Sequence, residues 1–273
     1  MAAGRKIKYI TLASLFAISL SIGIGYASWQ FNDSQSSSLN NNVGINSWRF
    51  SQALPIEPGQ TIDIASDGTV SIDGEVIEDA DIEYPGGAPE TGGGQVSMKI
   101  GVDEEGNLVV SEYSATNIGS ELFNYTQNLT FPQSISIDGN EYKILGISEP
   151  ITLSARGAYL FGDKTLTINV PEGYEYVCDG VFESFTFSNA SNLNVVYNLP
   201  SSLAYLGNNA FNFATSATIS IKYSGTVAQW RELIANSAAA YGSGYKFFSG
   251  ATGNITITCS DGNVRYNSNG VEQ

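Results

Sequence analysis

Short runs of alternating apolar and polar residues cover much of the chain, and turn-forming residues separate them. Residues 69–72 alternate in this way and lie between the dipeptides Asp67-Gly68 and Asp73-Gly74. Asp-Gly dipeptides favour the tight turns of β-hairpins because such turns need positive φ angles. This pattern predicts a small acidic β-hairpin region over residues 43–83.

A stretch rich in glycine and proline, residues 84–95, follows this region and is typical of a linker. We therefore expect a domain boundary there, with a second domain over residues 96–273. That domain opens with another alternating run, residues 96–100. The turn sequence Glu105-Gly106-Asn107 then precedes the apolar residues 108–110, which predicts a strand pair.

Within the second domain, apolar positions recur at matched distances from Pro171 and Pro200, which lie 29 residues apart. An earlier, less regular unit begins at residues 129–132 and is interrupted by a hairpin turn at Asp138-Gly139. In the two clear units the residues three, six and eleven positions after the proline are all apolar: Tyr174, Val177 and Phe182 in the first, and Leu203, Leu206 and Phe211 in the second.

Such units predict a short β solenoid, because none can bury its apolar face alone and stacking gives a continuous core. Proline suits the corner after each strand because it has no N–H to donate to a ladder. Chance similarity inside a β sandwich is the alternative. The overall fold class expected is mainly β.

These residues resemble the BspA-type leucine-rich repeat of bacterial surface proteins. The similarity is strongest over residues 199–211, continues through residues 219–230, and includes the strand-like residues 255–262. It implies a leucine-rich-repeat-like scaffold and a role in adhesion or in binding host and matrix molecules. Residues 147–163 depart from the pattern as an insertion, which leaves the repeat count open.

The end of the solenoid is expected to carry a capping helix and a final strand. Thr226 followed by Gln229 forms a capping-box sequence, which marks a helix N-terminus. We interpret Trp230 as part of the cap core, with a ligand-stacking role as the alternative. The helical apolar stripe comprises Val227, Trp230, Leu233 and Ile234.

The N-terminus has the composition of an export signal. Arg5, Lys6 and Lys8 precede an uncharged apolar stretch, residues 9–32, which is long enough to cross a bilayer as a helix. This hydrophobic helix is either a signal peptide cleaved after residue 27 or a membrane anchor. The Ser/Asn-rich residues 28–42 predict a flexible stalk.

Charge and composition exclude several classes of function. The formal charge of −15 makes nucleic-acid binding unfavourable, because the phosphate backbone is anionic. The chain has no histidine, so a Ser-His-Asp or Cys-His catalytic arrangement is impossible. Asp79, Asp81 and Glu83 alternate in an acidic stretch, which suggests either a calcium site or, more simply, a solvated surface. We expect no metal and no cofactor.

Two further features leave alternatives open. Cys178 and Cys259 either form one disulfide, which export would permit, or stay free thiols. A group of aromatic residues near the C-terminus supplies either ligand anchors or packing for the cap; it comprises Tyr241, Tyr245, Phe247 and Phe248.

The sequence therefore favours a non-catalytic, exported cell-surface module that binds an extracellular protein or glycan, with the N-terminal segment as its contact with the membrane if it is not cleaved. A structural subunit of a surface layer or fibre is the alternative, and a secreted glycoside hydrolase that uses two carboxylates is a third possibility. No individual ligand-binding residue is assigned.

Overall fold

The structure is a computed structural model that describes residues 54–85, 87–89, 95–116, 126–155, 164–183, 185–187, 193–213 and 218–273. The part from Ile56 to Gln273 is one compact unit. The expected N-terminal helix, the stalk and residues 43–53 lie outside the described residues. Within the described part, no helix has the length and apolar character needed to cross a membrane.

The described chain is mainly β, as expected from its alternating pattern. Its first strands form an antiparallel arrangement in the order β6-β5-β1-β2-β3. The predicted Asp-Gly turns are confirmed: Asp73 and Gly74 both have positive φ angles, 52° and 83°, between β2 and β3. The strands are β1 (Ile62–Ile64), β2 (Val70–Ile72), β3 (Glu75–Val76), β5 (Gln95–Val102) and β6 (Leu108–Thr116).

The Gly/Pro-rich residues 84–95 do not separate two compact units. Strand β1 pairs antiparallel with β5, so the strands on either side of this stretch belong to one sheet. Strand β4 (Asp81–Glu83) also pairs with β8 (Ser134–Ile137), which is far along the chain. A linker composition allows a chain reversal within a domain as readily as a boundary between domains, which is why the expected boundary fails.

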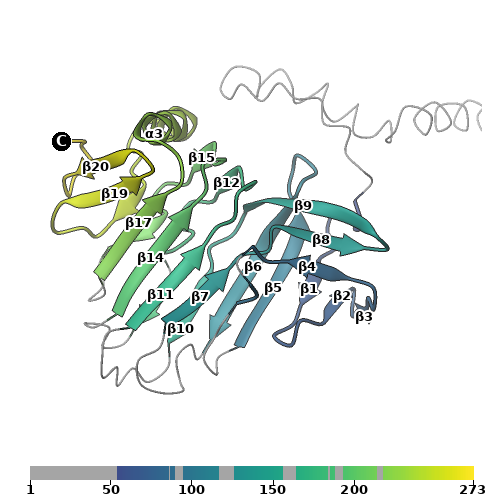
Figure 1. The fold of residues 1–273 in the computed structure, drawn as a ribbon. Helices are drawn as coiled ribbons and strands as arrows, with labels where there is room; N and C mark the ends of the chain where they lie inside the picture. The colour runs from purple at the N-terminus through teal and green to yellow at the C-terminus, as the bar shows by residue number, and fades with distance from the viewer. Residues whose placement is uncertain are drawn as a thin grey trace, which may run out of the picture. The chain divides into compact units, whose positions relative to one another are not determined.

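Five parallel strands and one antiparallel strand form a second sheet in the order β20-β19-β17-β14-β11-β7 (Figure 1). Side chains alternate between its two faces, and the inward positions are apolar. Its strands are β7 (Thr126–Thr130), β11 (Lys164–Asn169), β14 (Leu193–Leu199), β17 (Thr218–Tyr223), β19 (Ile255–Cys259) and β20 (Gly262–Tyr266).

Two shorter sets of parallel pairings accompany this sheet. In one, β12 (Tyr176–Val177) lies between β9 (Asn140–Ile147) and β15 (Tyr205–Leu206). We call these three strands the middle ladder. The other set comprises the pairs of β10 (Thr152–Ala155) with β13 (Phe185–Phe187) and of β16 (Phe211–Asn212) with β18 (Phe248–Ser249), together with a bridge between Phe182 and Phe211.

The 29-residue equivalence predicted from the sequence is confirmed in the strand register. Ile168 pairs with Tyr197, and the amide of Val170 donates to the carbonyl of Asn198 at 3.0 Å, so Pro171 and Pro200 follow equivalent strand ends. The apolar residues at matched distances from the prolines are all buried: Tyr174, Val177, Phe182, Leu203, Leu206 and Phe211. Equivalent residues therefore fill one shared interior.

One carboxylate ties together three successive strand ends. Glu172, next to Pro171, accepts hydrogen bonds from the backbone amides of Ser201 at 2.9 Å and Ser202 at 3.2 Å. It also accepts from the Ser224 hydroxyl, which follows β17. Burial raises the pKa of Glu172, but these hydrogen bonds outweigh burial and hold the pKa below its ordinary value.

The only helix among the described residues is α3 (Val227–Tyr241), and it begins with the predicted capping box. The Gln229 amide donates to the Thr226 hydroxyl, and the Gln229 side chain accepts from the Thr226 amide. Trp230 is fully buried, as expected for cap core, and its Nε1 donates to the Tyr266 hydroxyl at 3.0 Å.

The residues after β20 fold back along its free edge. The amide of Gln273 donates to the carbonyl of Arg265 at 2.9 Å, and Glu272 forms a bridge with Tyr266. The Glu272 carboxylate also pairs with Arg231 of α3. The chain's own residues therefore cover part of the free edge of the last strand.

Candidate functional site

Two tyrosines lie side by side on the middle ladder. Tyr176 of β12 and Tyr205 of β15 are register partners, and both are half-buried. The Tyr176 hydroxyl donates to Oδ2 of Asp103 at 2.7 Å. Its ring crosses Gly146 of β9, where a β-carbon would lie 2.7 Å from Cε1 and Cζ of the ring. The missing side chain of Gly146 thus leaves the space in which the ring lies.

The hydroxyl of Tyr205, one unit later, is also held by a carboxylate. It donates to Oδ1 of Asp179 at 3.1 Å. The same carboxylate oxygen accepts the backbone amide of Asn208 at 2.7 Å. Each tyrosine is therefore held by a carboxylate from an earlier turn or loop of the chain, which fixes the direction of the ring before any ligand binds.

Two more tyrosines continue the series at the C-terminal cap. Tyr241, the last residue of α3, is 44% exposed, and its ring centroid lies 6.1 Å from that of Tyr245. The Tyr241 hydroxyl accepts from the Asn208 side chain at 3.2 Å, and the Tyr245 hydroxyl donates to the carbonyl of Leu206 at 2.8 Å. We call Tyr176, Tyr205, Tyr241 and Tyr245 the tyrosine row.

The structure divides the four C-terminal aromatic candidates into two pairs. Tyr241 and Tyr245 reach the surface, whereas Phe247 and Phe248 are 2% and 1% exposed and pack inside the cap. Phe247 lies edge-on to Trp230, with ring centroids 5.5 Å apart. The two phenylalanines thus serve packing, and the two tyrosines remain available as ligand anchors.

The charges beside Tyr176 and Tyr205 are negative. Burial, followed by the neighbouring Asp103 and Glu105, raises the pKa of Tyr176. Burial and then Asp179 raise the pKa of Tyr205 to about 12. These phenols therefore stay protonated near neutral pH and act as hydrogen-bond donors to the carboxylates.

The outer face of the six-stranded sheet has a different character. Its described outward residues on β11, β14, β17, β19 and β20 are mainly threonine, serine and asparagine, and none of them is a carboxylate. They are Thr165, Thr167, Asn169, Asn194, Val196, Asn198, Thr218, Ser220, Lys222, Thr256, Thr258, Asn263 and Arg265. The acidity of the chain is therefore distributed unevenly over its surface.

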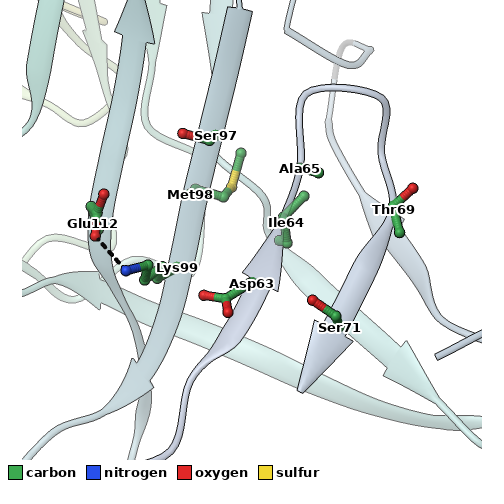
Figure 2. Close-up of a pocket in the computed structure, with 9 residues that line it drawn as sticks. All are labelled: Asp63, Ile64, Ala65, Thr69, Ser71, Ser97, Met98, Lys99 and Glu112. Atoms are coloured by element: carbon green, nitrogen blue, oxygen red, sulfur yellow. Dashed lines mark ion pairs between the residues drawn. The ribbon is translucent and has the colours of Figure 1, made fainter. Parts of the chain in front are cut away.

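A shallow hollow of about 180 Å³ lies on the N-terminal strands. Figure 2 shows Asp63 and Glu112 on either side of Lys99. The Lys99 Nζ atom lies 3.0 Å from Oε2 of Glu112, and both side chains are about half exposed. Because its only lysine is already paired, this hollow offers no free cation to a ligand and is a weaker candidate than the tyrosine row.

The acidic residues of β4 and the two cysteines were also candidates for a functional site. Asp81 and Glu83 lie on β4, and the described residues contain no cluster of three or more acidic, cysteine or histidine side chains arranged for a metal ion. Cys178 and Cys259 are both free thiols, the first half-buried and the second buried. Burial raises the pKa of the Cys178 thiol to about 12 and raises that of Cys259 as well.

The sequence contained a signal for Tyr176 and Tyr205. Both residues are tyrosines five positions after the aligned prolines, immediately before the buried positions Val177 and Leu206. Matching residues at an outward position of a repeat indicate a shared surface role. Their carboxylate partners were not predictable, because Asp103 and Tyr176 are 73 residues apart in the chain.

No family profile and no curated protein matches the chain. Among solved structures, the pneumococcal vaccine antigen PcpA matches 49% of this chain with 17% identity and a TM-score of 0.22. The match spans 41% of the PcpA chain. At that similarity it indicates neither a shared fold nor a shared function.

Proposed function

We propose that the chain is a non-catalytic, exported binding module held at a cell surface, built on a short leucine-rich-repeat-like β solenoid of the BspA type. The tyrosine row is its ligand-binding face, and its ligand is an extracellular protein or glycan. The uncharged N-terminal stretch behind Arg5, Lys6 and Lys8 directs export.

The strand register supports the solenoid assignment. Equivalent residues of β11 and β14 pair in parallel at an offset of 29 residues, as do those of β12 and β15. The ring of Phe182 stacks on that of Phe211, its equivalent one unit later, with centroids 5.3 Å apart. Stacked units of this kind bury apolar faces against their neighbours, and α3 with Trp230 covers the last of them.

The observation that carries the binding assignment is that Tyr176 and Tyr205 occupy equivalent positions of successive units and that Tyr241 and Tyr245 continue the row on the cap. Tyrosine is enriched at binding interfaces because it offers a large rigid ring with one polar end, and it loses little conformational entropy on binding. Hydrogen bonds to Asp103 and Asp179 already fix two of these rings. A pre-ordered aromatic surface pays less of this entropy when a ligand docks.

Binding by cells that display the full chain tests this proposal. We expect adherence to at least one member of a panel of immobilised extracellular proteins and glycans, and loss of that adherence in the Tyr205→Ala/Tyr241→Ala variant. The matched control is Thr167→Ala/Asn194→Ala on the outer face of the six-stranded sheet. Surface abundance is measured by antibody, and thermal unfolding of the purified variants verifies that both fold.

If no member of the panel retains the cells, or if adherence survives in both variants, then the tyrosine row is not the ligand-binding face. Tyr241→Ala alone serves as a second test, because Tyr241 is 44% exposed and its removal leaves the core intact.

A further inference from the structure

The charge around the tyrosine row narrows the class of ligand, given that the row is the binding face proposed above. Asp103 and Asp179 hold the phenol groups of Tyr176 and Tyr205 directly. Glu105 is exposed and close enough to act on the Tyr176 phenol. Carboxylates therefore lie beside Tyr176 and Tyr205.

Apart from Lys246, which follows Tyr245 in the chain, and Arg231, which lies on α3 with Tyr241, the described lysines and arginines lie on elements outside the row. Lys99 and Arg231 are paired with Glu112 and Glu272. The stem of Lys246 runs towards Gly270, whose β-carbon position would lie 3.6 Å from the lysine Cγ. The others are on the six-stranded sheet or on the β8–β9 hairpin: Lys164, Lys222, Arg265 and Lys143.

Aromatic faces bordered by carboxylates are complementary to ammonium and guanidinium groups. A cation is attracted by the electron-rich face of a tyrosine ring, and it forms charge-assisted hydrogen bonds with a neighbouring carboxylate. Tyr176 and Tyr205 lie on neighbouring strands, which are about 4.8 Å apart in a ladder, and Tyr241 and Tyr245 continue the row on the cap. The row therefore suits a ligand that carries more than one cation.

We propose that the tyrosine row binds a lysine- or arginine-rich segment of a polypeptide. The outer face of the six-stranded sheet, with no carboxylate among its described outward residues, provides the contrast within the same chain. A ligand drawn only by the net charge of −15 would have no preference for the row over other acidic surfaces. The preference for the row is therefore the property to measure.

Biolayer interferometry with the immobilised full chain tests this inference with three soluble probes. They are an eight-residue peptide of alternating arginine and serine, the same peptide with glutamate in place of arginine, and the neutral sugar cellohexaose. We expect the arginine peptide to bind and the other two not to bind. Raising the salt concentration should weaken the binding, because ions screen the carboxylates.

Two charge-matched variants then locate the site. Glu105→Gln/Asp179→Asn removes two carboxylates beside the row. The new asparagine keeps a side-chain oxygen that can accept the hydrogen bond from the Tyr205 hydroxyl. Asp79→Asn/Asp81→Asn removes two exposed carboxylates near β4 and is the control. We expect the first variant to raise the Kd for the arginine peptide about tenfold and the second to leave it unchanged. Tyr241→Ala should raise it about threefold.

Each outcome has one meaning. Equal weakening in the two charge variants would show attraction by net charge alone and would overturn the inference. Binding of cellohexaose that is lost in Tyr241→Ala, without binding of the arginine peptide, would overturn the inference and leave the tyrosine row as a glycan-binding face. If no probe binds and the displayed chain adheres to no panel member, both proposals fail together.

Discussion

The ring of Tyr176 lies directly over Gly146, its register partner on the neighbouring strand β9. A β-carbon at Gly146 would lie 2.7 Å from two atoms of that ring, closer than any van der Waals contact allows. The glycine has no positive φ, so the ring, and not the backbone conformation, restricts this position to a residue without a side chain.

We therefore predict that Gly146→Ala lowers the free energy of unfolding by roughly 1–3 kcal/mol through overpacking. Urea unfolding followed by circular dichroism measures the change. The double variant Gly146→Ala/Tyr176→Ala provides the control, because removing the ring removes the clash. The two effects should then be strongly non-additive, and simple additivity would show that the ring does not restrict Gly146.

The hydrogen bonds that Glu172 accepts from Ser201, Ser202 and Ser224 predict that the stability of the fold depends on pH. The pKa of this carboxyl is lower in the folded chain than its ordinary value of 4.5, so the charged form stabilises the fold. This contribution is fully present above the ordinary pKa and is lost as the pH falls through the lower pKa of the folded state. We expect Glu172→Gln to be less stable than the parent chain at pH 7.

The difference between the two proteins should stay constant down to about pH 5 and shrink as the pH falls further. Urea unfolding at a series of pH values gives the comparison. Glu141→Gln, at an exposed position of the β8–β9 hairpin, is the matched control and should keep the parent profile. A difference that grows on acidification would contradict this role for Glu172.

The hydrogen bond from Trp230 to the Tyr266 hydroxyl inside the cap predicts that removing this hydroxyl destabilises the fold. Tyr266→Phe leaves Nε1 of the fully buried Trp230 without its acceptor. We expect the free energy of unfolding to fall by about 1–3 kcal/mol, the usual cost of an unsatisfied buried donor. Thermal unfolding monitored by tryptophan fluorescence measures this loss of stability. Tyr241→Phe, which removes an exposed hydroxyl, should change the stability by less than about 0.5 kcal/mol.

The two free thiols, Cys178 and Cys259, are expected to react slowly with alkylating reagents in the folded chain. Burial, with Glu149 and Asp179 nearby, raises the pKa of Cys178 to about 12, so almost none of it is thiolate at pH 8. We expect maleimide labelling at pH 8 to be slow for the folded chain and to reach both cysteines in urea. Mass spectrometry counts the labels. Absence of labelling in urea would instead reveal a disulfide, and rapid labelling without urea would contradict the burial.

Much of the local structure could be predicted because it depends on residues near one another in sequence. The turns at Asp73-Gly74 and Asp138-Gly139 follow from dipeptides that tolerate positive φ angles. The 29-residue register follows from apolar positions repeated at fixed distances from Pro171 and Pro200. The helix start at Thr226 follows from a capping box contained in four residues.

The features that could not be predicted depend on contacts between distant residues. The pairing of β1 with β5 joins strands on both sides of the glycine-rich residues 84–95, and composition alone does not reveal which strands meet across such a stretch. The tyrosine row likewise depends on register between units, and its first member is held by Asp103, 73 residues earlier. Sequence reasoning proposed the aromatic residues of the cap but could not tell surface tyrosines from buried phenylalanines.

The fold-back of the residues after β20 has a consequence for self-association. Exposed strand edges recruit strands from other molecules, which is a common route to fibres. Here Glu272 and Gln273 already occupy part of the edge that an incoming copy would need. Polymerisation at this end would first require these two residues to leave the edge of β20 and the ion pair between Glu272 and Arg231 to break.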